Sequence, residues 1–280
     1  MTRLIPKLQR TAFRSTELYR NLHPRPGVVP AAEGSPPIVA SFTSIPQRSG
    51  FVHLAVASLL RQTLKPTRVV LWVAEDYPVT RALRRLERRG LEIRRTEDIG
   101  PYCKLIPSLQ HFPDALVATF DDDFIYRRRT LETLHRAWQR EPNAVHAMNA
   151  RPIARDADGR LAPYSTWKHS GTTRTPTNLL PIASAGVLYP PGAFGQGERP
   201  EVFNSEVFLK LAPRADDIWF KAMHLLAGTP VRTVEPPEIQ RAIVVPNTSP
   251  ELQSTNLNEG RYDQQIKAVF ERYGVLGLLV

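Results

Sequence analysis

Residues 115–123 read Ala-Leu-Val-Ala-Thr-Phe-Asp-Asp-Asp, an apolar run that ends abruptly in three carboxylates. A strand buried on both faces of a sheet has such a continuous apolar sequence. In open α/β sheets, ligands bind just beyond the carboxyl ends of the strands. Three adjacent acids repel one another unless a cation shares them, and their oxygens suit Mg²⁺ or Mn²⁺, whose coordination phosphate oxygens often complete. The stretch therefore predicts a metal and phosphate site at a strand end. The alternative is a solvated acidic turn.

Strands and helices alternate on both sides of this stretch, up to about residue 150. Short apolar runs indicate the strands, and apolar residues at helical spacing indicate the helices. The expected strands cover residues 38–43, 69–74, 91–95, 115–120 and 144–148, and the expected helices cover residues 52–61, 79–89, 105–112 and 129–140. This alternation predicts an α/β fold with a mostly parallel central sheet, right-handed crossovers and flanking helices.

The chain divides into three parts by composition. Residues 1–37 form a basic N-terminal arm that ends in a Pro-rich linker, residues 38–150 carry the alternating pattern, and residues 151–280 are less regular. The arm places Arg3, Lys7, Arg10 and Arg14 at helical spacing. It is either a basic helix that lies on an anionic bilayer or, as we favour, a solvated segment. The last part is expected to contain a polar loop at 151–182, a strand at 183–191, and helices at 216–226 and 264–272.

Composition narrows the class of protein. The 280 residues are 42% hydrophobic, and the net charge is +10. The lone Cys103 excludes an intramolecular disulfide and favours a reducing compartment. No apolar run approaches the roughly 18 residues of a membrane span, and the N-terminus lacks the apolar core of a secretory signal. We therefore expect a cytoplasmic protein, with peripheral contact at the inner membrane as an open alternative.

Much of the positive charge is local. The segment 81–90 predicts a helix with an arginine-rich face, and residues 127–129 are three further arginines. Each run is either a solvated face, which we favour, or a contact for an anionic partner. The sequence has no helix-turn-helix, RNA-binding signature or zinc-finger spacing, so nucleic acid is not an expected partner.

Several short blocks together resemble a known family. They read Thr-Ser-Ile-Pro at 43–46, Pro-Tyr-Cys-Lys-Leu-Ile-Pro at 101–107, Asp-Asp-Asp at 121–123, Gly-Val-Leu-Tyr-Pro-Pro at 186–191 and Ala-Asp-Asp-Ile-Trp at 215–219. In this order they resemble GT-A glycosyltransferases of the family 2-like type, in particular bacterial enzymes of surface-polysaccharide loci. Residues 58–71 are also similar to the first helix and second strand of that family. The resemblance covers about residues 38–270.

The resemblance implies a GT-A-like, Rossmann-like fold, with a nucleotide-sugar-binding half at 38–150 and an acceptor-binding half and tail at 151–280, together one GT-A domain. It assigns Mn²⁺ or Mg²⁺ chiefly to Asp123, with Asp121 near the metal or the ribose and Asp122 turned back into the protein. Lys104 would neutralise diphosphate charge or contact the base; the alternative is a surface lysine. The other expected donor-side residues are Thr43 and Ser44 at the first strand end, and Glu75 and Asp76 at the second, although the family's Asp-Asp-Gly-Ser is absent there.

The resemblance also implies an acceptor side. An inverting transferase needs a carboxylate to take the proton of the acceptor hydroxyl. Asp216 and Asp217 match the position of that base, and we favour Asp217; in a retaining enzyme the pair would have another role. Gly186, Tyr189 and Trp219 are expected on the acceptor side, with a core position the favoured alternative for Trp219.

The resulting hypothesis is metal-dependent, inverting sugar transfer from a nucleotide-diphosphate sugar to a glycan or lipid-linked acceptor in bacterial surface polysaccharide synthesis. The basic segments would suit an anionic acceptor or an anionic membrane. One alternative is a nucleotidyltransferase or phosphohydrolase that uses the same acids, but the sequence has no Gly-rich loop to cradle a nucleotide. The other is a glycan-binding module without catalysis.

Overall fold

The computed structural model describes residues 26–167, 177–195, 201–234, 243–244 and 260–279. For residues 243–244 it describes the backbone alone. The helical spacing of basic residues in the first 25 positions lies outside this described part. No helix within it is both long enough and apolar enough to cross a membrane.

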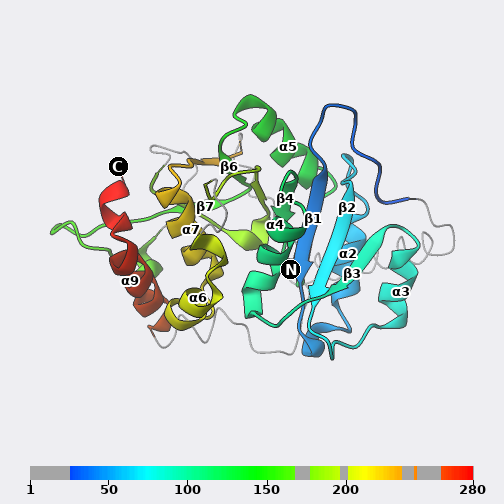
Figure 1. Cartoon of the computed structure of the whole chain (residues 1–280), viewed down its shortest axis with the longest axis horizontal. Coiled ribbons are helices and arrows are strands. Elements are labelled where there is room, and N and C mark those ends of the chain that lie inside the picture. Colours follow the sequence, from blue (N-terminus) through cyan, green and yellow to red (C-terminus); the bar gives the residue numbers. More distant parts are fainter. Residues whose placement is uncertain (1–25, 168–176, 196–200, 235–242, 245–259, 280) are drawn as a thin grey trace, which may run out of the picture.

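A seven-stranded sheet forms the centre of the molecule, in the order β10-β6-β9-β4-β1-β2-β3 (Figure 1). Its strands are β1 (Ile38–Thr43), β2 (Arg68–Val73), β3 (Leu91–Arg95), β4 (Leu116–Thr119), β6 (Val145–Ala147), β9 (Val187–Tyr189) and β10 (Val231–Thr233). Neighbouring strands pair in parallel, except that β9 is antiparallel to both β4 and β6. The predicted α/β class and mostly parallel sheet are therefore confirmed.

Two small antiparallel pairs lie outside the central sheet. β5 (Phe124–Ile125) pairs with β11 (Ile243–Val244), and β7 (Ala150–Pro152) pairs with β8 (Leu179–Pro181). The second pair brackets the polar loop 151–182, which the sequence presents as irregular throughout. Three-residue strands carry too short a pattern to be separated from loop by their sequence alone.

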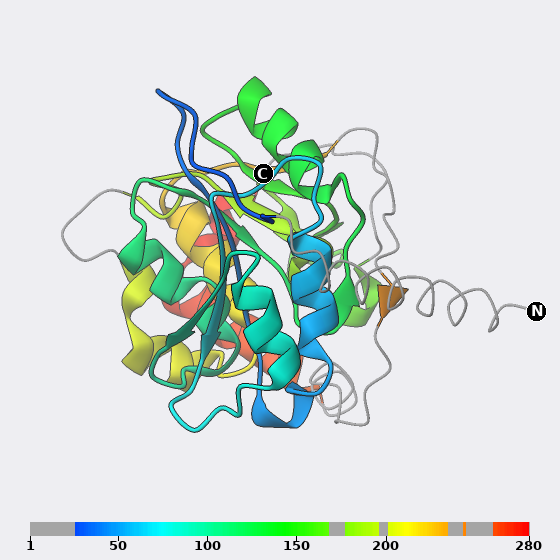
Figure 2. The same ribbon diagram turned by 90° about the vertical axis from the view of Figure 1, so that its right-hand side faces the viewer.

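Helices cover both faces of the central sheet (Figures 1 and 2). One face packs against α2 (Val52–Leu59), α3 (Arg81–Glu87) and α5 (Thr130–Arg140). The core on the other face includes α4 (Ile106–His111), α6 (Ser205–Leu211), α7 (Asp216–Leu226) and α9 (Arg261–Tyr273), of which α9 packs chiefly on α7. Successive strand side chains point to opposite faces, so in β1 Val39 joins the second core and Ala40 the first.

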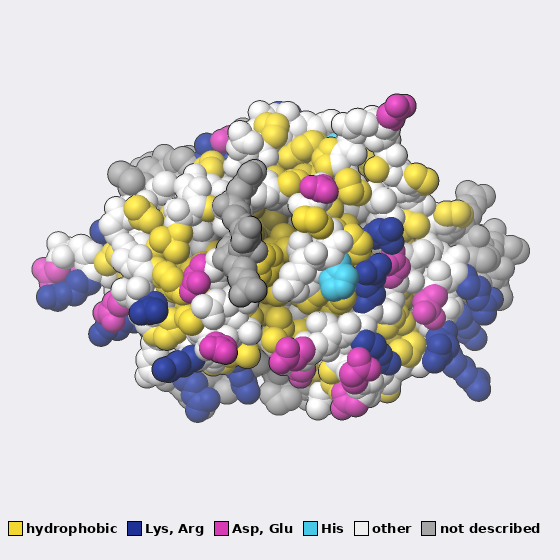
Figure 3. Space-filling view, viewed as in Figure 1, with side chains coloured by type: hydrophobic (Ala, Val, Ile, Leu, Met, Phe, Trp, Pro, Cys, Tyr) yellow, Lys and Arg dark blue, Asp and Glu magenta, His cyan; other side chains and the backbone are white. Residues whose placement is uncertain are grey.

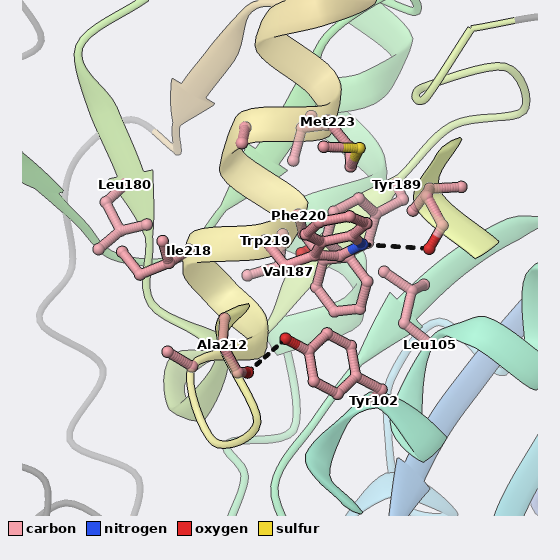
Figure 4. Packing of buried hydrophobic residues seen from close by; sticks show 14 of the residues in the cluster. Tyr102, Leu105, Leu180, Val187, Tyr189, Ala212, Ile218, Trp219, Phe220 and Met223 are labelled. Atoms are coloured by element: carbon pink, nitrogen blue, oxygen red, sulfur yellow. Dashed lines mark hydrogen bonds between the residues drawn. The ribbon is translucent and has the colours of Figure 1, made fainter. Parts of the chain in front are cut away.

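The core beneath α7 is rich in aromatic side chains (Figure 4). Trp219 is fully buried and its indole Nε1 donates to the carbonyl of Val202 at 3.1 Å. Tyr102 packs in the same cluster and donates to the carbonyl of Ala212 at 2.6 Å. These two hydrogen bonds satisfy polar atoms that burial would otherwise leave unpaired, and they fix the start of α7 against the sheet.

The strand expected at 183–191 is shorter in the structure. Residues Ala183–Ala185 form a turn of 3-10 helix, and the strand begins only after Gly186. Gly186 has a φ of +106°, and a side chain there would begin 3.0 Å from the ring of Phe120. A left-handed residue in close contact with a ring cannot continue the strand, so the turn stays beside the end of β4.

Candidate active site

The three carboxylates follow β4 directly and lie at the carboxyl edge of the parallel strands. The end of β1 brings Ser44 to them, the 3-10 helix η2 (Gly100–Lys104) brings Lys104, and the first turn of α7 brings Asp216. The site therefore joins elements that are distant in sequence and meet because parallel strands end at one edge of the sheet.

Asp122 is turned into the protein. Ser44 Oγ donates to its Oδ2 at 2.6 Å, and Arg48 Nη1 donates to its Oδ1 at 2.6 Å. The same Arg48 nitrogen lies 3.3 Å from Oδ2 of Asp123. Both oxygens of Asp122 are thus occupied, and Arg48 fixes the carboxyl groups of the second and third acids relative to each other. Asp121 and Asp123 keep 28% and 21% of their side chains exposed.

Lys104 connects the triplet to α7. Its Nζ donates to Asp121 Oδ1 at 3.0 Å and lies 3.1 Å from Asp216 Oδ2. The second contact is an ion pair without hydrogen-bond geometry, so Asp216 Oδ2 has no hydrogen-bond donor among the described residues. Burial alone would lower the pKa of Lys104, but Asp121 and Asp216 raise it above its usual range. Lys104 is therefore a charged ammonium between two acids.

A buried chain of polar groups holds Lys104 in place. Ser41 Oγ donates to the carbonyl of Lys104 at 2.6 Å, and it lies 2.8 Å from Ser108 Oγ, which accepts from Trp72 Nε1 at 2.8 Å. Because these groups are buried and mutually satisfied, they fix the backbone from which the lysine side chain extends.

Asp217 faces a different set of partners. Its Oδ2 accepts from the Tyr262 hydroxyl at 2.6 Å, and its Oδ1 accepts from the backbone N–H of Ile218 at 2.9 Å. Asp216 is 7% exposed, whereas Asp217 is half-buried. Asp217 is thus the more accessible acid of the pair and the one that forms no ion pair within the described part of the chain.

Negative charge exceeds positive charge at this edge. Asp121, Asp122, Asp123 and Asp216 face only Lys104 and Arg48 among the described residues. Burial, followed by repulsion from Asp121 and Asp122, raises the pKa of Asp123 to about 7. Burial also raises the pKa of Asp216 to about 7, against the opposing effect of Lys104. The site therefore favours a further cation.

The fold is similar to that of many solved structures, among them two glycosyltransferases. The mannosyltransferase PcManGT from Pyrobaculum calidifontis, solved in complex with GDP-Man and Mn²⁺, is 15% identical and superposes with a TM-score of 0.51 over 98% of this chain and 76% of its own. The TarS fragment 1–349 of S. aureus is 15% identical, with a TM-score of 0.43 over 84% of this chain and 70% of its own. No family model and no curated protein matches the sequence.

The chain shares the fold of a glycosyltransferase. The superposition on PcManGT extends over nearly the whole chain, so it includes both predicted halves. At 15% identity this likeness establishes the fold, and the chemistry of the site has to be argued from its own residues.

The residues present fit a divalent cation bound together with phosphate. Within the described residues, no group of three or more His, Cys, Asp or Glu side chains is arranged to hold a metal by itself. Mg²⁺-type sites, however, often use one or two carboxylates and complete their coordination with substrate phosphates and water. Asp121 and Asp123 are partly exposed and could supply that pair, whereas both oxygens of Asp122 are already bonded to Ser44 and Arg48.

The other expected donor-side residues lie at the same edge with different roles. Thr43 Oγ1 donates to the carbonyl of Trp72 at 2.9 Å, which ties the end of β1 to β2. Glu75 and Asp76 are exposed in the turn after β2 and make no hydrogen bond or ion pair within the described part. Their carboxylates therefore stay available to a ligand, whereas the Thr43 hydroxyl is already used.

The expected acceptor-side residues lie mainly in the core. Trp219 is fully buried and cannot stack on a sugar in this arrangement. This is the core position that the sequence analysis favoured for it. Tyr189 is 4% exposed and packs on Phe194, with ring centroids 5.5 Å apart. Gly186 allows the close approach to Phe120 described above. These three residues are buried and do not line an open surface.

Three residues of the site were not predicted from the sequence. Arg48 follows the Thr-Ser-Ile-Pro block but belongs to no motif, and Tyr262 lies in an otherwise ordinary polar helix. The hydroxyl of Tyr126 accepts from the backbone N–H of Asp121 at 2.8 Å and lies 3.1 Å from the carbonyl of Ser184, so it holds the triplet against the turn before β9. The only sequence signal for them is that Arg48 and Tyr126 lie close in the chain to the blocks at 43–46 and 121–123.

Proposed function

We propose that this protein is a metal-dependent glycosyltransferase that moves a sugar, with inversion, from a nucleotide-diphosphate sugar to a glycan or lipid-linked acceptor. The observation that carries the proposal is the Lys104 ammonium, which joins the acidic triplet to the acid pair of α7 at the strand ends. The proposal is supported by a cluster of acids that favours a cation and phosphate, by a carboxylate nearby that could take a proton, and by the glycosyltransferase fold.

The donor would lie at the triplet. Asp123 and Asp121 would hold Mn²⁺ or Mg²⁺, which when bound acts as a Lewis acid on the departing diphosphate. Lys104 is positioned to exchange one of its two carboxylate contacts for a phosphate oxygen, because a lysine ammonium has three donors on a flexible stem. Glu75 and Asp76 have exposed carboxylates that suit the hydroxyls of a ribose.

The acceptor would lie toward α7. Its hydroxyl oxygen forms the new bond to the anomeric carbon while the bond from that carbon to the diphosphate oxygen breaks. The hydroxyl proton passes to Asp217, whose two oxygens each accept one hydrogen bond and keep a second lone pair. Asp216 would instead hold Lys104 in place. The sequence blocks shared with enzymes of surface-polysaccharide loci support a role in that synthesis.

Nucleotide-dependent stabilisation gives the first test. We expect one of UDP, GDP, CMP and dTDP to raise the melting temperature in the presence of Mn²⁺ and much less in its absence. Ligand at 100 times its Kd contributes about 2.7 kcal/mol to folding, a rise on the order of 5 °C for a chain of this size. Differential scanning fluorimetry with each nucleotide, with and without Mn²⁺, measures this response.

Product analysis then separates the proposal from its rivals. With the donor that carries the stabilising nucleotide, the proposal requires sugar joined to an acceptor. Nucleotide joined to an acceptor, or simple hydrolysis of the phosphate, would replace it with a nucleotidyltransferase or phosphohydrolase. Glycan binding without any nucleotide response would replace it with a non-catalytic module.

We also propose peripheral contact with an anionic membrane through α3. Arg81, Arg84, Arg85 and Arg88 are exposed and make no ion pair with any residue that the structure describes. Lys and Arg side chains gather over this end of the molecule in Figure 3.

Vesicle binding tests this contact. Each basic residue near an anionic surface contributes about 1 kcal/mol, so we expect the Arg84→Glu/Arg85→Glu protein to bind phosphatidylglycerol-containing vesicles at least 10-fold more weakly in co-sedimentation. Arg160→Glu/Lys267→Glu makes the same change of charge at two exposed positions outside α3. Equal binding of both variants, or wild-type binding to neutral vesicles as well, would contradict an anionic contact at α3.

A further inference from the structure

The start of α9 holds two separate segments of the acceptor half, the polar loop and the chain around the first turn of α7. Tyr262 donates its hydroxyl to Asp217 in α7 at 2.6 Å. Asp263 Oδ1 accepts the backbone N–H of Tyr164 at 2.8 Å, in the 3-10 helix η3 (Tyr164–Thr166). Gln265 Oε1 accepts the backbone N–H of Arg214 at 3.1 Å, just before α7. Three side chains within four positions of one helix thus make two hydrogen bonds to the start of α7 and one to the polar loop.

Ring contacts reinforce these hydrogen bonds. The rings of Tyr164 and Tyr262 lie 4.4 Å apart, and the Arg151 guanidinium lies 4.8 Å above the ring of Tyr164. Tyr164 and Tyr262 are 6% and 8% exposed, so their rings pack as part of the core and do not form an open platform. The η3 turn of the polar loop and the start of α7 therefore share one buried joint at α9.

We infer that Tyr262 is a positioning residue for Asp217, and that the first turn of α9 assembles the acceptor side of the active site. The inference deepens the proposed glycosyltransferase function and rests on it for the role of Asp217. The α9 joint itself stands on the hydrogen bonds alone and can be tested without turnover.

The geometry shows how the orientation of Asp217 is fixed. The Ile218 N–H holds Oδ1 and the Tyr262 hydroxyl holds Oδ2, so the plane of the carboxylate cannot rotate without the loss of a hydrogen bond. A base must lie within hydrogen-bond reach of the proton that it takes. Without the Tyr262 hydroxyl, one oxygen would be released and the carboxylate would sample further orientations.

The same hydrogen bond affects the proton affinity of Asp217. Burial raises the pKa of Asp217, and the Tyr262 hydroxyl opposes that increase by stabilising the charged form. The other titratable or charged groups that face it are Lys104 and Tyr102 of η2, Asp121 after β4, Asp216 of α7, Tyr164 of η3 and Tyr189 of β9. Removal of the hydroxyl should therefore raise the pKa of Asp217, and the base should stay protonated to a higher pH.

Tyr262→Phe tests the role in turnover. Nucleoside diphosphate release is measured from the nucleotide sugar that carries the stabilising nucleotide. We expect kcat to fall about 10-fold near pH 7, the acid limb of the kcat profile to move up by about one pH unit, and the donor KM to stay within twofold. Tyr273→Phe is the matched control, because it removes a tyrosine hydroxyl from the same helix, where Tyr273 contacts Glu201. An unmoved acid limb in Tyr262→Phe would overturn the positioning role.

Hydrogen exchange tests the joint independently of turnover. In Asp263→Ala we expect amide exchange in peptides that cover 160–167 to rise about 10-fold, and in Tyr262→Phe we expect the same for 214–218. Glu271→Ala, at an exposed position of α9, is the control and should leave both regions unchanged. Unchanged exchange in both test variants would overturn the joint. If exchange increases in the test variants but the wild-type protein transfers no sugar, the joint stands and the proposed function is rejected.

Discussion

Asp123→Asn is expected to abolish Mn²⁺-dependent nucleotide binding and to lower sugar transfer by about 1,000-fold. The substitution removes one of the two partly exposed carboxylates of the triplet, while Asp122 stays occupied by Ser44 and Arg48 and cannot take its place. A metal that stabilises developing charge supplies several kcal/mol to the transition state, and each 1.36 kcal/mol is a factor of ten in rate. Scanning fluorimetry with the stabilising nucleotide and an assay of transfer measure the two effects.

The same variant should not harm the fold. Burial, followed by repulsion from Asp121 and Asp122, raises the pKa of Asp123 to about 7, so an uncharged amide at this position relieves that repulsion. We expect the melting temperature without ligand to be unchanged or slightly higher. Asp114→Asn, at an exposed position just before β4, is the matched control and should keep full nucleotide response and activity. Full Mn²⁺-dependent transfer by Asp123→Asn would contradict the metal assignment.

Asp217→Asn is expected to lower kcat by a factor of about 100 to 10,000 and to leave nucleotide binding with Mn²⁺ intact. An amide has nearly the same shape but cannot take a proton, and a positioned general base contributes about that factor. Asp217 does not contact Lys104 or the triplet within hydrogen-bond distance, so the donor side should be unaffected. Steady-state kinetics and nucleotide-dependent melting separate the two steps.

Asp217 lies in the first turn of α7, where a negative charge also stabilises the helix. A control is therefore needed to separate the loss of this stabilisation from the loss of the base. Glu206→Gln removes a carboxylate from the first turn of α6 and should leave kcat unchanged. If Asp217→Asn kept its rate while Asp216→Asn lost it, Asp216 would be the base. If both variants kept their rates, the inverting mechanism with an α7 base would be rejected.

The local sequence pattern was sufficient to predict most of the longer helices and strands. β1, β3 and α7 begin and end at the predicted residues, because each is an apolar or amphipathic run long enough to show its period. α6 and the short strands β7, β8 and β10 were not predicted. Each of these is short, and its stability comes from burial against distant segments, as with Phe208 of α6, which stacks on Tyr102 at 3.9 Å between ring centroids. Tertiary packing decides such elements, and a single-sequence pattern does not contain it.

The sequence by itself determined the order of the elements and the place of the acidic triplet, because a strand and the acids that follow it are neighbours in the chain. Only the tertiary structure decided which acids are free. Arg48 reaches Asp122 across 74 residues, and Tyr262 reaches Asp217 across 45. Such partners have no fixed sequence spacing, since loops and crossovers of many lengths can bring the same two side chains together. The pairing of each charge, and with it the division of the site into metal-side and base-side carboxylates, therefore follows from the packing of the sheet, η2, α7 and α9.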